Sequence, residues 1–527
     1  MRRWFMILFL LVVFLLQNSA GQDCRTCHQQ TQSNCNLTCQ DCHLSSRAEF
    51  KPNVKDHPRI IKNPSREQYW QEKCVSCHKT EIASFKNSLH YSSAGIIDQT
   101  RFLFGKNKTL LQTDAEAWKK LRDIRDVEQK KPGGVVDHLL ASKCLACHFE
   151  ADRRSDVAGR KHAVGCASCH VQIDQQSGKP LHGHRFQKKV KDQVCLTCHS
   201  GNRVGADYYG YFEHDYHNQY NTPYGAKAQF GAFQHRLTAD VHRQAGLQCV
   251  DCHREHVARK IRPQYEGQQP LVRCQDCHGG FNEKPAIKVT RAKRFESTVI
   301  AHQNFHQRLR CSACHARWSY QDYGLHLFLD QSAHYEMWAD YLWQGDGEVT
   351  QLLQQQLGLA PPERKPAYSL NKISGKKMNG VWYQAWTFRR WEDPVLGVDE
   401  QGKIGIIRPL YQYFITFVDS LEQVWIDSQK PVRADGQPGW NWAVYGPHTI
   451  GKSGRQCESC HLNGKAVGLG LRQSIEDEVV NKITLPQPPI LPGQRLLNGK
   501  EKRKLLNKTV KYRQMRAKML RKLFESK

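Results

Sequence analysis

The stretch Cys166-Ala-Ser-Cys169-His170 contains a five-residue pattern around which the whole chain is organised. The pattern is two cysteines separated by two residues and followed directly by a histidine. It recurs nine times, and these copies begin at Cys24, Cys39, Cys74, Cys144, Cys195, Cys249, Cys274, Cys311 and Cys457. Because only 26 of 527 residues are histidine, a histidine after every second cysteine is not an accident of composition.

This pattern is the attachment site of a c-type haem. The two thiols add to the vinyl groups of one porphyrin, and the histidine ligates the iron from the proximal side. Structural zinc on paired cysteine knuckles is the alternative, but it does not explain the histidine after every pair. We therefore expect ten haem c groups per chain.

The thioether bonds are expected at Cys24, Cys27, Cys39, Cys42, Cys74, Cys77, Cys144, Cys147, Cys166, Cys169, Cys195, Cys198, Cys249, Cys252, Cys274, Cys277, Cys311, Cys314, Cys457 and Cys460. The proximal iron ligands are expected to be His28, His43, His78, His148, His170, His199, His253, His278, His315 and His461.

From CRTCH at 24 to CESCH at 457, the chain resembles the multihaem c-type cytochromes of respiring bacteria. The resemblance is to the class, and no subfamily is indicated. It implies electron transfer between closely stacked haems. In some members of the class it also implies reduction or oxidation of small nitrogen or sulfur compounds.

The ten motifs and this resemblance imply a multihaem cytochrome fold, mainly α with little regular structure around a haem stack, plus a β-containing haem-free insert. Only 39% of the residues are hydrophobic, but ten porphyrins would supply most of the apolar interior. The formal charge of +27 falls to roughly +17 with oxidised haems and +7 with reduced haems, because each haem carries negative charge. The basic residues therefore indicate propionate pairing, with acidic redox partners or anionic substrates steered by the remaining charge, rather than nucleic acid.

Residues 1–20 have the pattern of a Sec signal peptide. Arg2 and Arg3 precede an unbroken apolar run from Trp4 to Leu16, and we expect cleavage after Ala20. The run is shorter than the about 20 residues that span a bilayer. The alternative is that the segment is not cleaved and remains as an anchor. Export agrees with haem attachment, so we expect a periplasmic or otherwise extracytoplasmic protein.

Residues 21–318 form the expected nine-haem region. Six motifs follow one another between Cys144 and His315, a density that predicts contact between haems. A helix is expected at 114–129, ended by the breaker residues that follow it. Cys35 lies outside the motifs and is a spare thiol, a metal ligand or an unusual attachment site. The tyrosine-rich segment 206–225 either packs on porphyrins or lines a substrate pocket.

Residues 319–456 are expected to form a haem-free, Trp-rich insert of mixed α/β structure. Together with Trp318 they hold nine of the 12 tryptophans. A helical start is expected near 335–357, with strands in 381–392, 404–409 and 411–425. The insert is either a cover for the haem stack or a module that makes a substrate or partner site.

The chain ends with the tenth haem segment, 457–484, and then 485–527. Residues 485–493 are a proline-rich linker. Beyond it, 495–527 contain 13 Lys and Arg against two Glu, with apolar residues near one helical face. This basic tail indicates peripheral contact with an anionic membrane or an acidic partner, or else a solvated helix without a partner.

Sixteen histidines remain after the proximal ligands are assigned, which is enough for a second histidine on every iron. Histidines shortly before a motif often serve a neighbouring haem in this class. The preferred distal ligands are His90, His138, His162, His182, His217, His242, His256, His302, His306 and His448. Ordinary roles are expected for His57, His235, His326 and His334.

Three functions compete at this point. The first is electron transfer across the periplasm, with acidic cytochromes or a membrane quinol-oxidising complex as partners. The second is a multihaem oxidoreductase acting on nitrite, hydroxylamine or a sulfur oxyanion at one open haem, although no motif ends in lysine. The third is the cytochrome subunit of a membrane quinol-oxidising complex. Whether the chain is an enzyme is left open by the sequence.

Overall fold

The computed structural model describes residues 37–44, 60–110, 116–181, 185–201, 205–213, 229–253, 272–280, 284–288, 292–293, 295–296, 302, 304–341, 346–391, 393, 395–410, 412–468 and 490–525. The expected signal peptide, the first motif with Cys24, Cys27 and His28, and Cys35 lie outside these residues. So do the distal candidates His182, His217 and His256.

The first part of the described chain consists of helices, most of them of only one or two turns. They are α2 (Cys39–His43), α3 (Trp70–Lys73), α4 (Val75–Lys86), α5 (Leu89–Ser92), α6 (Ala94–Leu103), α7 (Pro132–Ser142), α8 (Ala167–His170), α9 (Asp192–Leu196), α10 (Val241–Gln244), α11 (Cys249–Cys252), α12 (Cys274–His278) and α13 (Cys311–His315). Two short strands, β1 (Tyr211–Glu213) and β2 (Gln234–Arg236), pair in antiparallel fashion between α9 and α10.

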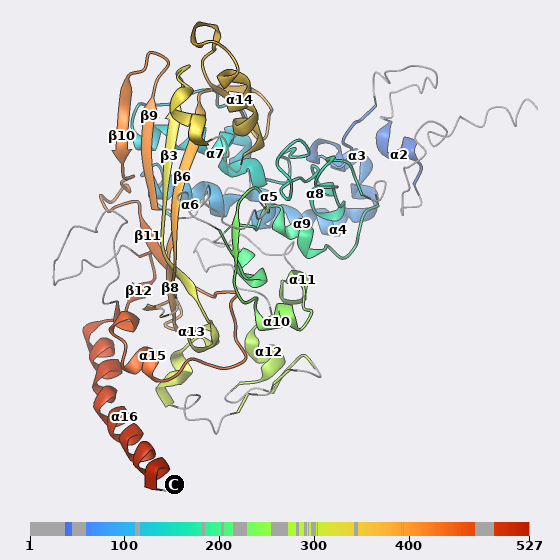
Figure 1. Ribbon diagram of the computed structural model, residues 1–527. Coiled ribbons are helices and arrows are strands. Elements are labelled where there is room, and N and C mark those ends of the chain that lie inside the picture. The colour runs from blue at the N-terminus through green and yellow to red at the C-terminus, as the bar shows by residue number, and fades with distance from the viewer. Residues whose placement is uncertain are drawn as a thin grey trace, which may run out of the picture.

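A four-stranded sheet follows directly after α13, with strand order β10-β9-β3-β6. Strand β3 (Ser319–Asp330) pairs antiparallel with β6 (Val381–Trp391) and parallel with β9 (Gln412–Val418), which forms a hairpin with β10 (Val424–Gln429). Figure 1 shows these long strands side by side. The aromatic and β-branched runs of 381–392 and 411–425 therefore contain strands.

A second four-stranded sheet has the order β11-β8-β7-β12. It contains β7 (Leu396–Val398), β8 (Ile404–Leu410), β11 (Asn441–Tyr445) and β12 (Arg495–Leu496). The end of the expected proline-rich linker joins this sheet, because the backbone N–H of Leu491 donates to the carbonyl of Trp442 at 3.0 Å. Leu491 is buried, so residues 490–493 are part of the packed structure and do not act as a free spacer.

Between β3 and β6 the chain forms α14 (Gly347–Leu357) and the hairpin of β4 (Tyr368–Leu370) and β5 (Lys377–Asn379). A 3₁₀ turn at Glu336–Tyr341 precedes α14. The helical start expected near 335–357 is thus divided into a turn and a helix.

One hydrophobic core joins the helices of residues 70–151 to the sheets. Trp118, Leu139 and Leu140 from the helical part pack in the same cluster as Trp382 and Phe417 from the strands. Each of these side chains is at most 1% exposed, so this cluster is a true interior.

The prediction of a helix at 114–129 is wrong for most of this segment. The structure has a 3₁₀ turn at Ala117–Leu121 followed by turns and bends, with 111–115 outside the described residues. The backbone of 121–126 instead bonds to the sheet region: Asn379 N–H donates to the Arg125 carbonyl, and the Asn371 amide donates to the Leu121 carbonyl. These tertiary bonds replace the i to i−4 bonds of a helix, so local propensity does not decide the conformation.

The last element is α16 (Gly499–Glu525), a 27-residue helix in the basic tail. Its first turns contact the short helix α15 (Glu458–His461) of the tenth motif, and its far end projects from the body of the molecule (Figure 1). Among the described residues, no helix combines the length and apolar character required to cross a bilayer.

Candidate haem-binding centres

Several motifs fold as one helical turn whose start is fixed by an aspartate inside the motif. Asp41, Asp251 and Asp276 each stand between the two cysteines, at the third helical position. Their carboxylates accept the N–H of the residue before the helix, at 2.6, 2.8 and 2.7 Å respectively. This is the backward bond of a capping box, so these motif sequences specify their own helical start.

The helical turn brings the reactive groups together. In at least five of the described motifs the histidine N–H donates to the carbonyl of the first cysteine, as in His170 to Cys166 at 3.1 Å and His461 to Cys457 at 2.9 Å. Residues three and four apart share one face of a helix, so both thiols and the histidine lie on the same side. This local geometry fits thioether attachment to one porphyrin edge.

Successive motifs lie next to one another. The Cys147 sulfur is 4.0 Å from the Cys198 carbonyl, and the Cys198 sulfur is 3.7 Å from the Cys147 carbonyl. The thiols of two further pairs are close enough to hydrogen-bond, and five more pairs interact electrostatically. The hydrogen-bonding pairs are Cys195–Cys249 and Cys274–Cys311. The electrostatic pairs are Cys42–Cys74, Cys74–Cys166, Cys169–Cys195, Cys252–Cys274 and Cys314–Cys460. Through these pairs eight of the nine described motifs follow one another in chain order, and the motif at 144–148 lies to one side, next to Cys198.

Four motif histidines face a second histidine at nearly the same distance. The ring centres are separated by 6.1 Å for His90–His199, 6.0 Å for His242–His278, 6.2 Å for His253–His448 and 6.2 Å for His306–His461. Two metal–nitrogen bonds of about 2 Å, plus the distance from each nitrogen to its ring centre, add up to roughly 6 Å. The four pairs thus have the spacing that two axial ligands of one iron require.

Hydrogen bonds to the backbone also fix the orientation of several motif histidine rings. Nδ1 of three motif histidines donates to a backbone carbonyl: His43 to Ile61 at 2.7 Å, His170 to Gln187 at 2.7 Å and His461 to Leu505 at 2.9 Å. His278 bonds to the Lys293 carbonyl in the same way, at 2.6 Å. Such a bond selects the tautomer and directs Nε2 to the opposite side, where a metal ligates it.

Two buried carboxylates orient distal candidates. Asp240 accepts the Nδ1 proton of His242 at 2.8 Å, and Asp207 lies 3.4 Å from Nδ1 of His448. Burial would raise the pKa of Asp207, but His448 outweighs burial and lowers that pKa. The sequence analysis missed both aspartates. The spacing Asp240-Val-His242 was an available signal, whereas Asp207 is distant in sequence from His448 and gave none.

His138 does not have the geometry of an iron ligand. It is 1% exposed, its Nε2 is 2.7 Å from the Asn379 carbonyl, and the Trp382 indole N–H donates to its Nδ1 at 3.0 Å. Burial lowers the pKa of His138 to about 4, so the ring is neutral. Both nitrogens are engaged inside the core between α7 and β6. These surroundings do not favour the expected distal role of His138, which stays a prediction.

The motif at 144–148 differs from the others. Residues 144–147 form a 3₁₀ turn, and the His148 N–H donates to Leu145 rather than to Cys144. The His148 ring is 1% exposed, with its centre 4.4 Å from that of Trp118. Its Nε2 is 3.1 Å from the Tyr91 carbonyl, and its Nδ1 accepts the Glu150 N–H at 3.1 Å. Both nitrogens are therefore bound by backbone, and this histidine does not fit proximal ligation.

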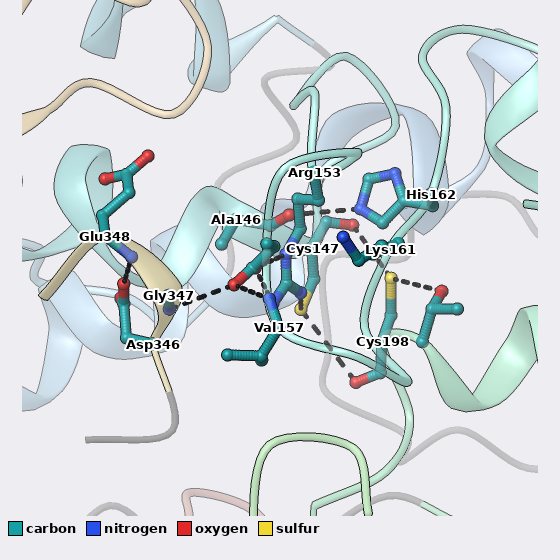
Figure 2. Close-up of polar contacts among 12 residues, drawn as sticks. Ala146, Cys147, Arg153, Val157, Lys161, His162, Cys198, Asp346, Gly347 and Glu348 are labelled. Carbon is teal, nitrogen blue, oxygen red and sulfur yellow. Dashed lines mark hydrogen bonds and ion pairs between the residues drawn. The ribbon is translucent and has the colours of Figure 1, made fainter. Parts of the chain in front are cut away.

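Figure 2 shows the surroundings of this motif. Arg153 donates to the Cys147 sulfur at 3.8 Å and forms an ion pair with Asp156, whose carboxylate also accepts the Gly347 N–H at 3.3 Å. Gly347 is the first residue of α14, so the motif segment is held by the sheet region. His162 lies beside it, with Nε2 3.3 Å from the Ala146 carbonyl.

Three other described histidines are one distal candidate, His302, and two residues for which ordinary roles are expected, His326 and His334. His302 donates from Nδ1 to the Glu296 carbonyl at 2.9 Å and interacts electrostatically with His315. His326 bonds to Thr416 and His334 to Glu422, both at 2.8 Å in the sheet region. The thioether and ligand roles of all these residues stay predictions, with the pairs at 6.0–6.2 Å as the best fit.

Comparison with known proteins gives two family matches, each to a part of the chain. A family model described as cytochrome c3 matches residues 241–323, and one described as cytochrome c554 and c-prime matches residues 73–171. Each matched range contains three of the motifs. No curated protein and no solved structure matches the chain.

Proposed function

Because the chain is a multihaem c-type cytochrome, we propose that it carries electrons through ten covalently bound haem c groups. The proposed place is the periplasm or another extracytoplasmic compartment, within an anaerobic or metal, sulfur or nitrogen respiratory chain. The observation that carries the proposal is the set of four histidine pairs at 6.0–6.2 Å.

Haem c supplies one-electron redox chemistry when it is bound. The chain's contribution is to attach it through two thiols and to occupy both faces of its iron with imidazoles. An iron with two histidine ligands has no position for a substrate, so it is suited to electron transfer. His90 and His199 come from separate segments, as do His253 and His448, and each pair therefore also ties the fold together.

The row of neighbouring motifs supports the same proposal. Thiols of one motif lie beside those of the next, as with Cys195 and Cys249. Porphyrins attached to such thiols have edges that lie close together. The signal peptide pattern supports export, and the residual positive charge favours acidic redox partners through electrostatic steering. Acidic cytochromes or a membrane quinol-oxidising complex are the proposed partners.

The first test is haem content and ligation of the purified holoprotein. Mass spectrometry of the intact chain should give ten haems, with all 20 motif cysteines modified. Low-temperature EPR of the oxidised protein should be dominated by low-spin bis-histidine signals. A chain with mostly high-spin signals would contradict the proposal.

A variant of one distal histidine makes the test specific. His90→Ala should convert one low-spin haem to high spin, because the ring that faces His199 is lost. The matched control is His334→Ala, since the His334 ring contacts Glu422 away from any motif. An unchanged low-spin count in the His90 variant would remove the basis of the pairing.

The motif at 144–148 favours a second candidate function, that of an oxidoreductase. A haem on Cys144 and Cys147 would lack its expected proximal imidazole, because both His148 nitrogens are bound by backbone groups. Such a centre would have an open iron position. The substrate classes are nitrite, hydroxylamine or a sulfur oxyanion.

Comparison of His148→Ala with His170→Ala tests this second candidate. Loss of the His170 ring should lower the low-spin count by one, whereas loss of the His148 ring should leave it unchanged. A high-spin signal that shifts with added nitrite, hydroxylamine or sulfite in the wild type would support the enzyme. If both variants lose one low-spin haem, the motif at 144–148 is an ordinary one and the enzyme candidate fails.

A further inference from the structure

Helix α16 combines a fixed first part with an exposed last part. Glu501 in its first turn pairs with Arg495 at 2.6 and 2.9 Å and exchanges bonds with Asn498, which caps the helix. Leu505 and Leu506 pack against the cluster of Ala313, Val467 and neighbouring residues. These contacts of its first turns fix the direction of the helix relative to the rest of the chain.

The fixed part also contacts the tenth motif. The Leu505 carbonyl accepts the Nδ1 proton of His461 at 2.9 Å, and Arg516 pairs with Glu458 at 2.8 Å. Cys457 is exposed, so this motif lies at the surface next to the helix. Whatever binds α16 is thereby brought to the candidate haem of His461.

The last three turns present two different faces to solvent. Leu520 and Phe524 are 44% and 76% exposed and share one face with Ala517, because these residues are spaced by three and four. Lys518 and Lys522 are exposed on the opposite face, and Arg521 is exposed at the edge of the apolar face. Over its whole length the helix has 11 Lys and Arg against two Glu.

We propose that α16 binds an anionic lipid bilayer surface, with Leu520 and Phe524 inserted among the lipids. A helix with a basic face and exposed Leu and Phe on the other face is suited to lie in the interface of a bilayer. An acidic protein partner would need the charges but not two large exposed apolar side chains. This inference rests on the proposed electron-transfer function in one respect only. The purpose of membrane binding would be to hold the surface haem of His461 near redox partners in the membrane.

The experiment measures binding of the full-length holoprotein to vesicles by co-sedimentation. The probes are vesicles of phosphatidylcholine alone and of phosphatidylcholine with phosphatidylglycerol. We expect binding to the anionic vesicles only, weakening about fivefold for each basic residue reversed, as in Lys518→Glu. Phe524→Ala should weaken binding about tenfold, because it removes the aromatic ring that is proposed to insert into the bilayer.

Two matched control variants separate this helix from the rest of the surface. Leu421→Ala removes an apolar side chain that is 85% exposed in the β9–β10 turn, and β10 and α16 lie at opposite ends of the molecule in Figure 1. Lys377→Glu reverses an exposed charge on the hairpin of β4 and β5. Both controls should bind vesicles as the wild type does.

Three outcomes would overturn the proposal. Equal binding to both kinds of vesicle, or an equal effect of Leu421→Ala and Phe524→Ala, would exclude a specific role for α16. Binding that responds to Lys518→Glu but not to Phe524→Ala would show charge attraction alone, as expected for an acidic protein partner. Haem content and EPR are measured on the same samples, so failure of the lipid proposal is distinguishable from failure of the proposed function.

Discussion

The role of each histidine in this chain is decided by what its Nδ1 and Nε2 contact. His242 and His138 look alike in the sequence, because both precede a motif by a few residues. In the structure Nδ1 of His242 donates to Asp240 and its ring faces His278, whereas His138 is enclosed by Trp382 and Asn379. One is placed as a ligand and the other is a core residue.

Asp240→Asn should change the properties of one haem without removing its ligand. A carboxylate that accepts the Nδ1 proton makes the imidazole a stronger donor and so favours ferric iron. Without this charge, we expect the midpoint potential of the haem held by His242 and His278 to rise by about 60 mV, corresponding to a tenfold change in affinity. EPR-monitored potentiometry measures it, and the low-spin signal should remain. Asp427→Asn, on the exposed face of β10, is the control, and an equal shift in both variants would contradict a positioning role.

At the residue scale, the sequence predicts attachment far better than pairing. The motif spacing is local, so cysteines and proximal histidines can be named from the sequence alone. The distal partner depends on tertiary structure, since the whole sheet-forming stretch from β3 to β11 separates His253 from His448 in the sequence. The surroundings of His148 were also not predictable, because they depend on Tyr91, Trp118 and a 3₁₀ turn rather than on the motif.

At the scale of single elements, α14 shows how a helix outside the motifs supports them. Asp346 caps the helix by accepting the N–H groups of Glu348 and Val349, and its carboxylate pairs with Lys143, the residue before Cys144. Burial would raise the pKa of Asp346, but Lys143 and Lys372 outweigh it and hold the pKa well below its usual range.

Asp346→Asn retains a capping side chain but removes the charge. We expect the free energy of unfolding to fall by about 2 kcal/mol at pH 7, because a charged hydrogen bond is lost. The folded pKa is lower than the unfolded value of about 3.9, so this stabilisation is complete above pH 4 and decreases as the pH falls below it. Denaturant unfolding at several pH values measures the difference. Asp123→Asn, in an exposed pair with Lys376, should have no measurable effect at any pH, and a constant difference for the Asp346 variant would contradict the argument.

Strands were predictable where aromatic and β-branched residues are continuous, as in β6 and β9. The segment 114–129 was not, because its helical pattern competes with bonds to Asn371 and Asn379, more than 240 positions later in the sequence. A pattern that reports local propensity contains no information about such partners.

At the scale of the whole molecule, the helical part and the sheets share one interior. Leu139 of α7 lies in the same cluster as Trp382 and Phe417, so the largest cluster of residues 319–445 is shared with the helical part. A smaller cluster around Tyr335, Leu353 and Tyr383 lies within these residues. The domain boundaries drawn from motif spacing stay a prediction, but packing crosses the boundary at 319.

Leu139→Ala should therefore destabilise both parts together. We expect a loss of about 2–5 kcal/mol, the usual cost of deleting a buried leucine side chain. Far-UV circular dichroism follows the sheets and Soret absorbance follows the haem environment, and both melting temperatures should fall by the same amount. Leu421→Ala is the exposed control. Separate transitions, with only one affected, would show that the two parts unfold independently.

The bonds between the ninth and tenth motifs have a consequence for the order of assembly. Gly451 donates to the His315 carbonyl and Arg455 to the Cys314 carbonyl, so two segments on either side of all the long strands lie together. These bonds close a loop that contains the long strands. Bringing together two segments so distant in sequence is one of the slow steps of folding. Synthesis proceeds from the N-terminus, so the motifs up to Cys314 emerge before the chain that completes their surroundings. From this order of emergence we expect the tenth motif to be the last to join its neighbours.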